Sequence, residues 1–124
     1  MKAHDSLAPC PDRPNCVSSE ASAPGQAVAP MQLAGRSDTE WADIQVLIGR
    51  LPRSEIVTAT DRYLHATLKS RIFGFVDDLE LRLDPQTDVI HIRSASRSGH
   101  YDLGVNRRRV ERLRKQLRAA ALIR

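Results

Sequence analysis

Aromatic side chains are scarce in this chain of 124 residues, where they make up 4% of the positions. A core must therefore be mainly aliphatic, and a nucleic-acid-binding face that stacks bases on a row of rings is not expected. Long apolar runs are lacking too, so the sequence offers no candidate for a membrane-spanning helix. The first ten residues, MKAHDSLAPC, lack the apolar run of a secretory leader. We therefore expect a soluble protein, cytoplasmic by default.

Cysteine is almost absent, with only Cys10 and Cys16 present and five residues between them. Zinc ribbons use two C-x2-C pairs, so both the spacing and the number argue against zinc, and we expect neither a metal nor a cofactor. Two cysteines close together in a proline-rich segment suit a disulfide if the compartment is oxidising. Two free thiols, with Cys16 buried, remain an equal alternative.

The net charge of +4 is unevenly distributed along the chain. Residues 106–124 contain eight Lys or Arg side chains and one Glu, a charge of +7, which leaves −3 for the other 105 residues. Such a segment can bind nucleic acid or an anionic membrane surface. We favour a simpler interpretation, in which it is the solvated face of a helix packed on a slightly acidic body. The length is that of one domain, and a monomer is the default expectation.

Residues 1–36 differ in composition from the rest of the chain. They contain five of the seven prolines, and Ser and Ala fill much of the remainder. Regular structure is not expected here, apart from a short extended piece around residues 28–33. We therefore divide the chain into a Pro/Ser/Ala-rich N-terminal arm, residues 1–36, and a single domain, residues 37–124.

A helix is predicted directly after the arm. Ser37 and Glu40 have the spacing of a capping box, and Pro52 marks the end of the helix. Between these positions the apolar residues recur at helical spacing: Trp41, Ile44, Leu47, Ile48 and Leu51.

Four strands are predicted next, over residues 54–61, 63–70, 78–84 and 89–96. The third alternates cleanly, with three leucines on one face and charged residues on the other. In the fourth, Ile90 and Ile92 are expected to face the core. His91, Arg93 and Arg97 then lie on the opposite face.

The last predicted element is a helix with Asn106 as its N-cap. Its apolar stripe consists of Val110, Leu113, Leu117, Ala120 and Ala121. The order of elements indicates an α+β fold: a four-stranded antiparallel meander with two helices packed on one face, preceded by the irregular arm.

Three arginines, Arg107 to Arg109, fall in the first turn of this helix, where cations are unfavourable by about 0.3–1 kcal/mol each. A bound anion would offset this cost, because helix N-termini bind phosphate and carboxylate groups. An internal salt-bridge network of Arg93, Arg97 and Arg107 with Asp77 and Asp78 would offset it equally well, and we favour that interpretation.

Two further arrangements are open. A hydrolase could combine a serine of residues 94–98 with His91 or His100 and with Asp102. The sequence contains no Gly-x-Ser-x-Gly elbow, so an enzyme is the less favoured interpretation. An acidic metal site at Asp77, Asp78 and Glu80 is also conceivable, although adjacent carboxylates more often pair with arginines.

Three separated stretches, residues 9–21, 63–84 and 89–114, resemble the signatures of the DUF1499 family in the same order: PCPDRPNCVSSEA, YLHATLKSRIFGFVDDLELRLD and VIHIRSASRSGHYDLGVNRRRVERLR. The resemblance extends from Pro9 to about Leu117. The family consists of small proteins of unknown function, mainly bacterial and also found in plastid-bearing organisms. Many members carry a membrane or export segment before the cysteine motif, which implies an association with the cell envelope. No catalytic residues come with the resemblance.

The resemblance implies that residues 70–78 and 91–109 form one polar constellation. We expect a non-enzymatic domain that binds a small anionic ligand or a protein partner at an Arg/Ser/Asp corner, with a phosphate- or carboxylate-ester hydrolase as one alternative. A binder of anionic membranes or nucleic acid through the basic last helix is another, nucleic acid being the less expected. The candidate ligand-binding residues are Asp77, Asp78, Arg93, Ser94, Ser96, Arg97, Asp102, Asn106 and Arg107.

Overall fold

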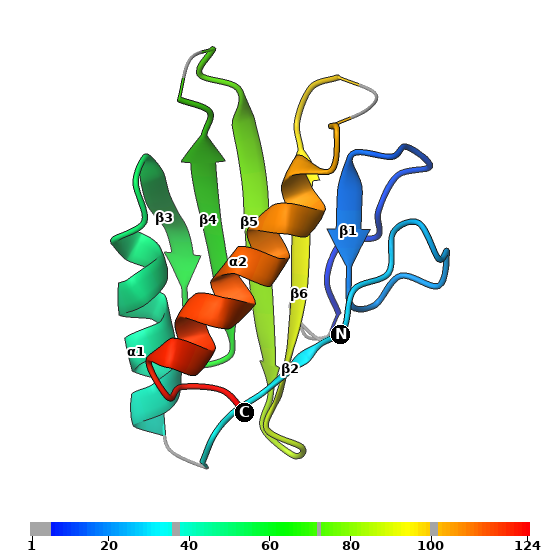
Figure 1. Ribbon diagram of the computed structural model, residues 1–124. Coiled ribbons are helices and arrows are strands. Elements are labelled where there is room, and N and C mark those ends of the chain that lie inside the picture. The colour runs from blue at the N-terminus through cyan, green and yellow to red at the C-terminus, as the bar shows by residue number, and fades with distance from the viewer. Residues whose placement is uncertain (1–5, 36–37, 72, 100–101) are drawn as a thin grey trace.

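The computed structural model describes residues 6–35, 38–71, 73–99 and 102–124. They form an α+β structure with two helices and one antiparallel sheet (Figure 1). The strands are β1 (Cys16–Ser18), β2 (Met31–Gln32), β3 (Ser54–Ala59), β4 (Tyr63–Lys69), β5 (Val76–Asp84) and β6 (Val89–Ser96). The helices are α1 (Asp38–Gly49) and α2 (Val105–Ala119).

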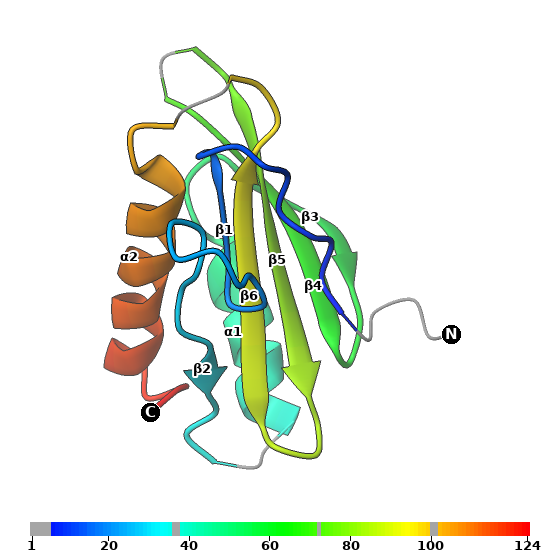
Figure 2. The same cartoon turned by 90° about the vertical axis from the view of Figure 1, so that its right-hand side faces the viewer.

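The sheet has six strands, so the prediction of four was wrong in this detail. The four predicted strands form the meander β3-β4-β5-β6, and the proline-rich arm supplies the other two. β1 pairs with one half of β6, where Cys16 lies opposite Ala95, and β2 pairs with the other half, where Met31 lies opposite Ile90. Figure 2 shows both short strands along the outer edge of β6. The arm therefore covers a sheet edge whose backbone groups would otherwise face water.

Alternation of side chains along β5, and along β6 as far as Ser94, gives the sheet an apolar face and a polar face. Side chains of β5 are alternately half-buried and buried from Val76 to Asp84, and Ile90 and Ile92 of β6 are fully buried, as predicted. Burial of each of these aliphatic side chains contributes about 1.5–3 kcal/mol to the stability of the folded state. The apolar face and both helices share one core, which includes Trp41, Ile44, Ile48, Val110, Leu113 and Leu117.

The end of α2 differs from the prediction. Ala120 and Ala121 are exposed, because the helix ends at Ala119 and Ala121 takes a left-handed conformation with φ 60°. The chain then turns back, so that Leu122 and Ile123 enter the core in their place. Within the described residues, no helix combines the length and the apolar character needed to cross a membrane.

Candidate functional site

Asn106 is the centre of a buried hydrogen-bond network beneath the first turn of α2. Its side chain is fully buried. The carbonyl oxygen accepts hydrogen bonds from Ser94 Oγ at 2.7 Å and from Arg109 Nη1 at 2.8 Å. The amide nitrogen donates to Asp102 Oδ2 at 2.8 Å, to Ser96 Oγ at 2.9 Å and to the carbonyl oxygen of Asn15 at 3.2 Å. One amide thus connects the helix, the end of β6 and the arm.

The prediction that Asn106 caps this helix was wrong, because Gly104 is the N-cap and Asn106 points inward. Asp102 satisfies the free backbone N–H groups instead. Its Oδ1 accepts from the Gly104 N–H at 2.8 Å, and its Oδ2 accepts from the Asn106 N–H at 3.0 Å. Burial favours the neutral acid, but the hydrogen bonds from Asn106 and Gly104 outweigh it and lower the pKa of Asp102. The ionised Asp102 carboxylate is therefore favoured and places a negative charge at the start of the helix.

Each arginine of the first helical turn contacts a group of the protein itself. Arg109 forms an ion pair with Asp77, with 2.7 Å between Nη2 and Oδ2, and both side chains are largely buried. Arg108 donates to the carbonyl oxygen of Leu103. Arg107 donates at 3.0 Å to the carbonyl oxygens of Gly25 and Ala27 in the arm. The cations at the helix start are thus offset by an internal carboxylate and by backbone dipoles.

The polar face of the sheet carries a second set of charged groups. Arg97 binds Asp78 through two hydrogen bonds of 2.9 Å, and His65 Nε2 lies 2.7 Å from Asp78 Oδ1. The hydrogen bond from Arg97, with help from His65, lowers the pKa of Asp78 despite partial burial. Arg93 lies opposite Glu80 and contacts its carboxylate at 3.1 Å.

Glu80 also accepts a hydrogen bond from the Tyr63 hydroxyl. Burial and this carboxylate raise the pKa of Tyr63. Arg82 pairs with Glu20 of the arm at 2.7 Å. Across this face, anions and cations alternate between neighbouring strands, so the row of charges is internally balanced.

The sheet separates the candidate residues into two groups. Neighbouring side chains of a strand point to opposite faces of the sheet. Asp77, Ser94 and Ser96 therefore lie on the helix face with Asn106, whereas Asp78 and Arg93 point to the other face. Arg93, Arg97 and Asp78 share the opposite face. Arg107 lies on α2 and contacts the arm. The three arginines of the expected corner therefore bind three different sets of partners.

The alternation of side chains along β6 also separates the serine and the histidine of the hypothetical hydrolase site. Ser94 is buried against Asn106 on the helix face, whereas His91 alternates with it and contacts Ser19 of the arm on the other side of the sheet. His100 lies outside the described residues. Among the described residues, no group of three or more His, Cys, Asp or Glu side chains is placed to hold a metal ion. Asp77 is on the other face from Asp78 and Glu80.

His91 gives a pH dependence that tests the packing of the arm. Burial and the Arg82 guanidinium lower the pKa of His91, and its Nδ1 lies 3.0 Å from Ser19 Oγ. The unfolded chain, with a His pKa of about 6.5, then takes up this proton more readily than the folded protein. The stabilisation by neutral His91 is therefore complete above about pH 6.5 and is lost as the pH falls toward the folded pKa.

We expect urea unfolding at pH 7.5 and 5.5 to show a larger loss of stability for the wild type than for His91→Gln. The remaining histidines titrate in both proteins, so the difference reports on His91. Equal losses in the two proteins would show that His91 is not buried as described.

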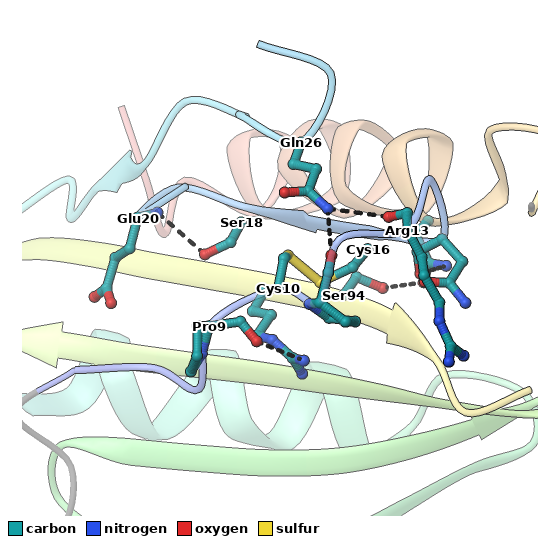
Figure 3. The surroundings of a disulfide bond; sticks show 12 residues. Pro9, Cys10, Arg13, Cys16, Ser18, Glu20, Gln26 and Ser94 are labelled. Carbon is teal, nitrogen blue, oxygen red and sulfur yellow. Dashed lines mark hydrogen bonds between the residues drawn. A yellow bond between two sulfur atoms is a disulfide. The ribbon is translucent and has the colours of Figure 1, made fainter. Parts of the chain in front are cut away.

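The arm is closed on itself by a disulfide between Cys10 and Cys16. Cys16 is the first residue of β1 and is buried against the sheet. Gln26 donates from Nε2 to the carbonyl oxygens of Pro11 and Arg13 inside the disulfide loop, at 2.7 and 3.0 Å (Figure 3). The loop is thereby fixed between β6 and the turn that follows β1. Asn15, Ser19 and Glu20 were not singled out from the sequence, although the cysteine motif contained all three.

A pocket of about 310 Å³ lies on the helix face and shares only Arg109 with the buried network around Asn106. Its apolar lining comes from the α1–β3 connection, from β4 and β5, and from α2: Leu51, Pro52, Leu68, Leu79 and Leu113. Four cations and one amide complete the lining, namely Arg53, Lys69, Arg109, Arg112 and Gln116, and none of the described residues that line it is acidic. In Figure 1, α2 crosses the sheet diagonally, with α1 lying to one side.

Of the pocket cations, Arg109 is compensated by Asp77, whereas the described residues show no ion pair for the exposed Arg53, Lys69 or Arg112. Arg53 also has φ 59°, a left-handed conformation that glycine adopts at lower cost. Its Nε donates to the backbone carbonyl oxygen of Lys69, so the Arg53 side chain lies against the end of β4. The pocket combines apolar walls with excess positive charge at its edge.

Comparison with known proteins identifies a family without an assigned activity. The family model for DUF1499, described as a protein of unknown function, matches residues 6–117. No curated protein and no solved structure shows a match. The matched range covers the disulfide arm, all six strands and most of α2. The chain therefore belongs to the DUF1499 family.

Proposed function

We propose that this domain is a non-catalytic binding domain for a small anionic amphiphile, a molecule with an apolar tail and a carboxylate or phosphate head. The observation that carries the proposal is the pocket near Leu79, whose described lining has apolar walls and four basic residues but no acidic residue. Ligand pockets are typically apolar cavities with a few placed polar groups that orient the ligand. The tail would contact Leu68, Leu79 and Leu113, and the head would lie at the edge near Arg53 and Arg112.

The expected Arg/Ser/Asp corner is less suited to an incoming anion. Asn106 uses both of its side-chain polar atoms within the protein, and Arg107 is engaged by two carbonyl oxygens. Arg97 is held by Asp78. An anion at Asn106 would leave a buried polar group unpaired, at a cost of about 1–3 kcal/mol. An anion at the exposed Arg97 or Arg107 would have to displace the partners that these side chains already have. Among the described residues, the exposed Arg112 side chain shows no hydrogen bond or ion pair that an incoming anion would have to displace.

The left-handed Arg53 supports the same assignment. Non-glycine residues in sparsely populated backbone regions cost of order 1–3 kcal/mol and cluster at functional sites. Glycine would adopt this backbone conformation at a lower energetic cost, yet the position at the pocket edge is occupied by an arginine. A role in orienting an anionic head group accounts for that choice.

The test is calorimetric titration of sodium decanoate, below its micelle concentration, into the wild type, Arg112→Glu and Lys115→Glu. Lys115 is an exposed cation of the same helix outside the pocket lining, so the two variants make the same change in charge. We expect Arg112→Glu to weaken binding about tenfold, since about 1.4 kcal/mol corresponds to that factor. Lys115→Glu should stay within about twofold of the wild type.

Decanol, which has the same tail and no charge, is expected to bind more weakly than decanoate. Absence of decanoate binding by the wild type would refute the proposal. Equal weakening by both charge reversals would also refute it, because it would indicate unspecific attraction to the basic helix.

A further inference from the structure

Both phenylalanines of this aromatic-poor chain lie in one exposed position, at the tip of the β4–β5 hairpin. Phe73 and Phe75 are 75% and 57% exposed. Their rings stack on each other, with 5.5 Å between the ring centroids. The hairpin is fixed below them, because the Ser70 N–H donates to the Phe75 carbonyl oxygen and the Phe75 N–H donates to Ser70 Oγ. The rings are therefore held in water rather than folded onto the core.

The connection between β6 and α2 and the first residue of α2 add further apolar side chains at the same end of the sheet. Leu103 is 71% exposed and Val105 is 40% exposed. Leu103 has φ 58°, and its carbonyl oxygen accepts a hydrogen bond from Arg108. Figures 1 and 2 both show the β4–β5 and β6–α2 connections projecting beyond the strands at one end. We call Phe73, Phe75, Leu103 and Val105 the apolar tip.

Cations lie beside the apolar tip. Residues 69–76 contain Lys69 and Arg71, both exposed, and no acidic residue. Arg108 borders Leu103. Basic side chains are attracted to a membrane surface that contains anionic lipid, while aromatic and aliphatic side chains enter its interface. Exposed aromatic and aliphatic side chains beside basic ones are the composition of surfaces that bind the membrane interface.

We propose that the apolar tip docks on anionic lipid membranes, with Phe73 and Phe75 inserted at the interface and Lys69, Arg71 and Arg108 facing the head groups. This inference is independent of the pocket, because it rests on different residues, apart from Lys69, and requires no bound ligand. The contact is peripheral and reversible, since a few inserted side chains bury far less than a spanning helix.

The experiment is cosedimentation with vesicles of phosphatidylcholine and phosphatidylglycerol (3:1), and with vesicles of phosphatidylcholine alone. We expect the wild type to bind the anionic vesicles more strongly and to lose binding as salt rises. Phe73→Ser/Phe75→Ser should reduce the partition coefficient about tenfold or more. The matched control is Val46→Ser/Val57→Ser, which removes apolar side chains that are 49% and 55% exposed elsewhere and should leave binding unchanged.

A wild type that does not bind anionic vesicles would overturn the proposal. Equal binding by the wild type and the phenylalanine variant would overturn it as well. Light scattering on the same proteins provides a further check. A wild-type dimer that becomes a monomer only in Phe73→Ser/Phe75→Ser would assign the tip to contacts between copies of the chain and would likewise overturn it.

Discussion

Asn106→Ala should be among the most destabilising substitutions in the protein, lowering the free energy of unfolding by about 3 kcal/mol. The amide makes five side-chain hydrogen bonds in a fully buried position, and its loss leaves Ser94, Ser96 and Asp102 short of partners. For a domain of this size the melting temperature should fall by about 10 °C or more. Urea unfolding followed by circular dichroism measures the change.

Arg108→Ala is the matched control for this prediction. Arg108 lies in the same helical turn and is exposed, and in the described hydrogen bonds its side chain contacts only the Leu103 carbonyl oxygen. Its substitution should change stability by no more than about 0.5 kcal/mol. If Asn106→Ala were as mild as Arg108→Ala, the buried network would not be what joins the arm, β6 and α2.

Loss of the Cys10–Cys16 disulfide should destabilise the protein by about 2 kcal/mol, because the bond closes a short loop and restricts the unfolded chain. The effect should be concentrated at the outer edge of β6. There the Ser96 N–H donates to the Asn15 carbonyl oxygen, and Cys16 is buried. Urea unfolding with and without a phosphine reductant measures the energy, and amide exchange at Ser96 and Ser18 locates it.

Cys10→Ser/Cys16→Ser is the control for reduction, since added reductant should have no further effect on this variant. Two reactive thiols in the native, air-oxidised wild type, together with no effect of reductant on its stability, would contradict the assigned disulfide. The stability of the arm would then depend on its hydrogen bonds and buried side chains alone.

The meander was predictable because its strands carry their own pattern. Leucines at every second position of β5 identified the strand and its buried face, and the isoleucines did the same for β6. β1 and β2 carry no such pattern, since they contain three and two residues and are defined by backbone pairing with β6. Composition alone therefore made the arm look irregular.

The candidate site was only partly predictable for a related reason. Closeness in sequence grouped Asp77 with Asp78 and Arg93 with Ser94, whereas the alternation of a strand separates each pair between opposite faces. The pairing of acidic and arginine side chains was anticipated, although Arg109 rather than Arg107 binds Asp77. The pocket could not be anticipated, because its lining comes from four separated segments that resemble ordinary core and solvated helix surface.

The most direct test of the proposed function is to locate decanoate on the protein by NMR, following the backbone amide shifts of the wild type during titration. The pocket predicts saturable shifts concentrated at residues 51–53, 68–69, 79 and 109–116. Residues 93–97 and the arm around Gly25 should remain nearly unchanged. Shifts centred on Arg93, Arg97 and Arg107, or spread without saturation along α2, would contradict the account.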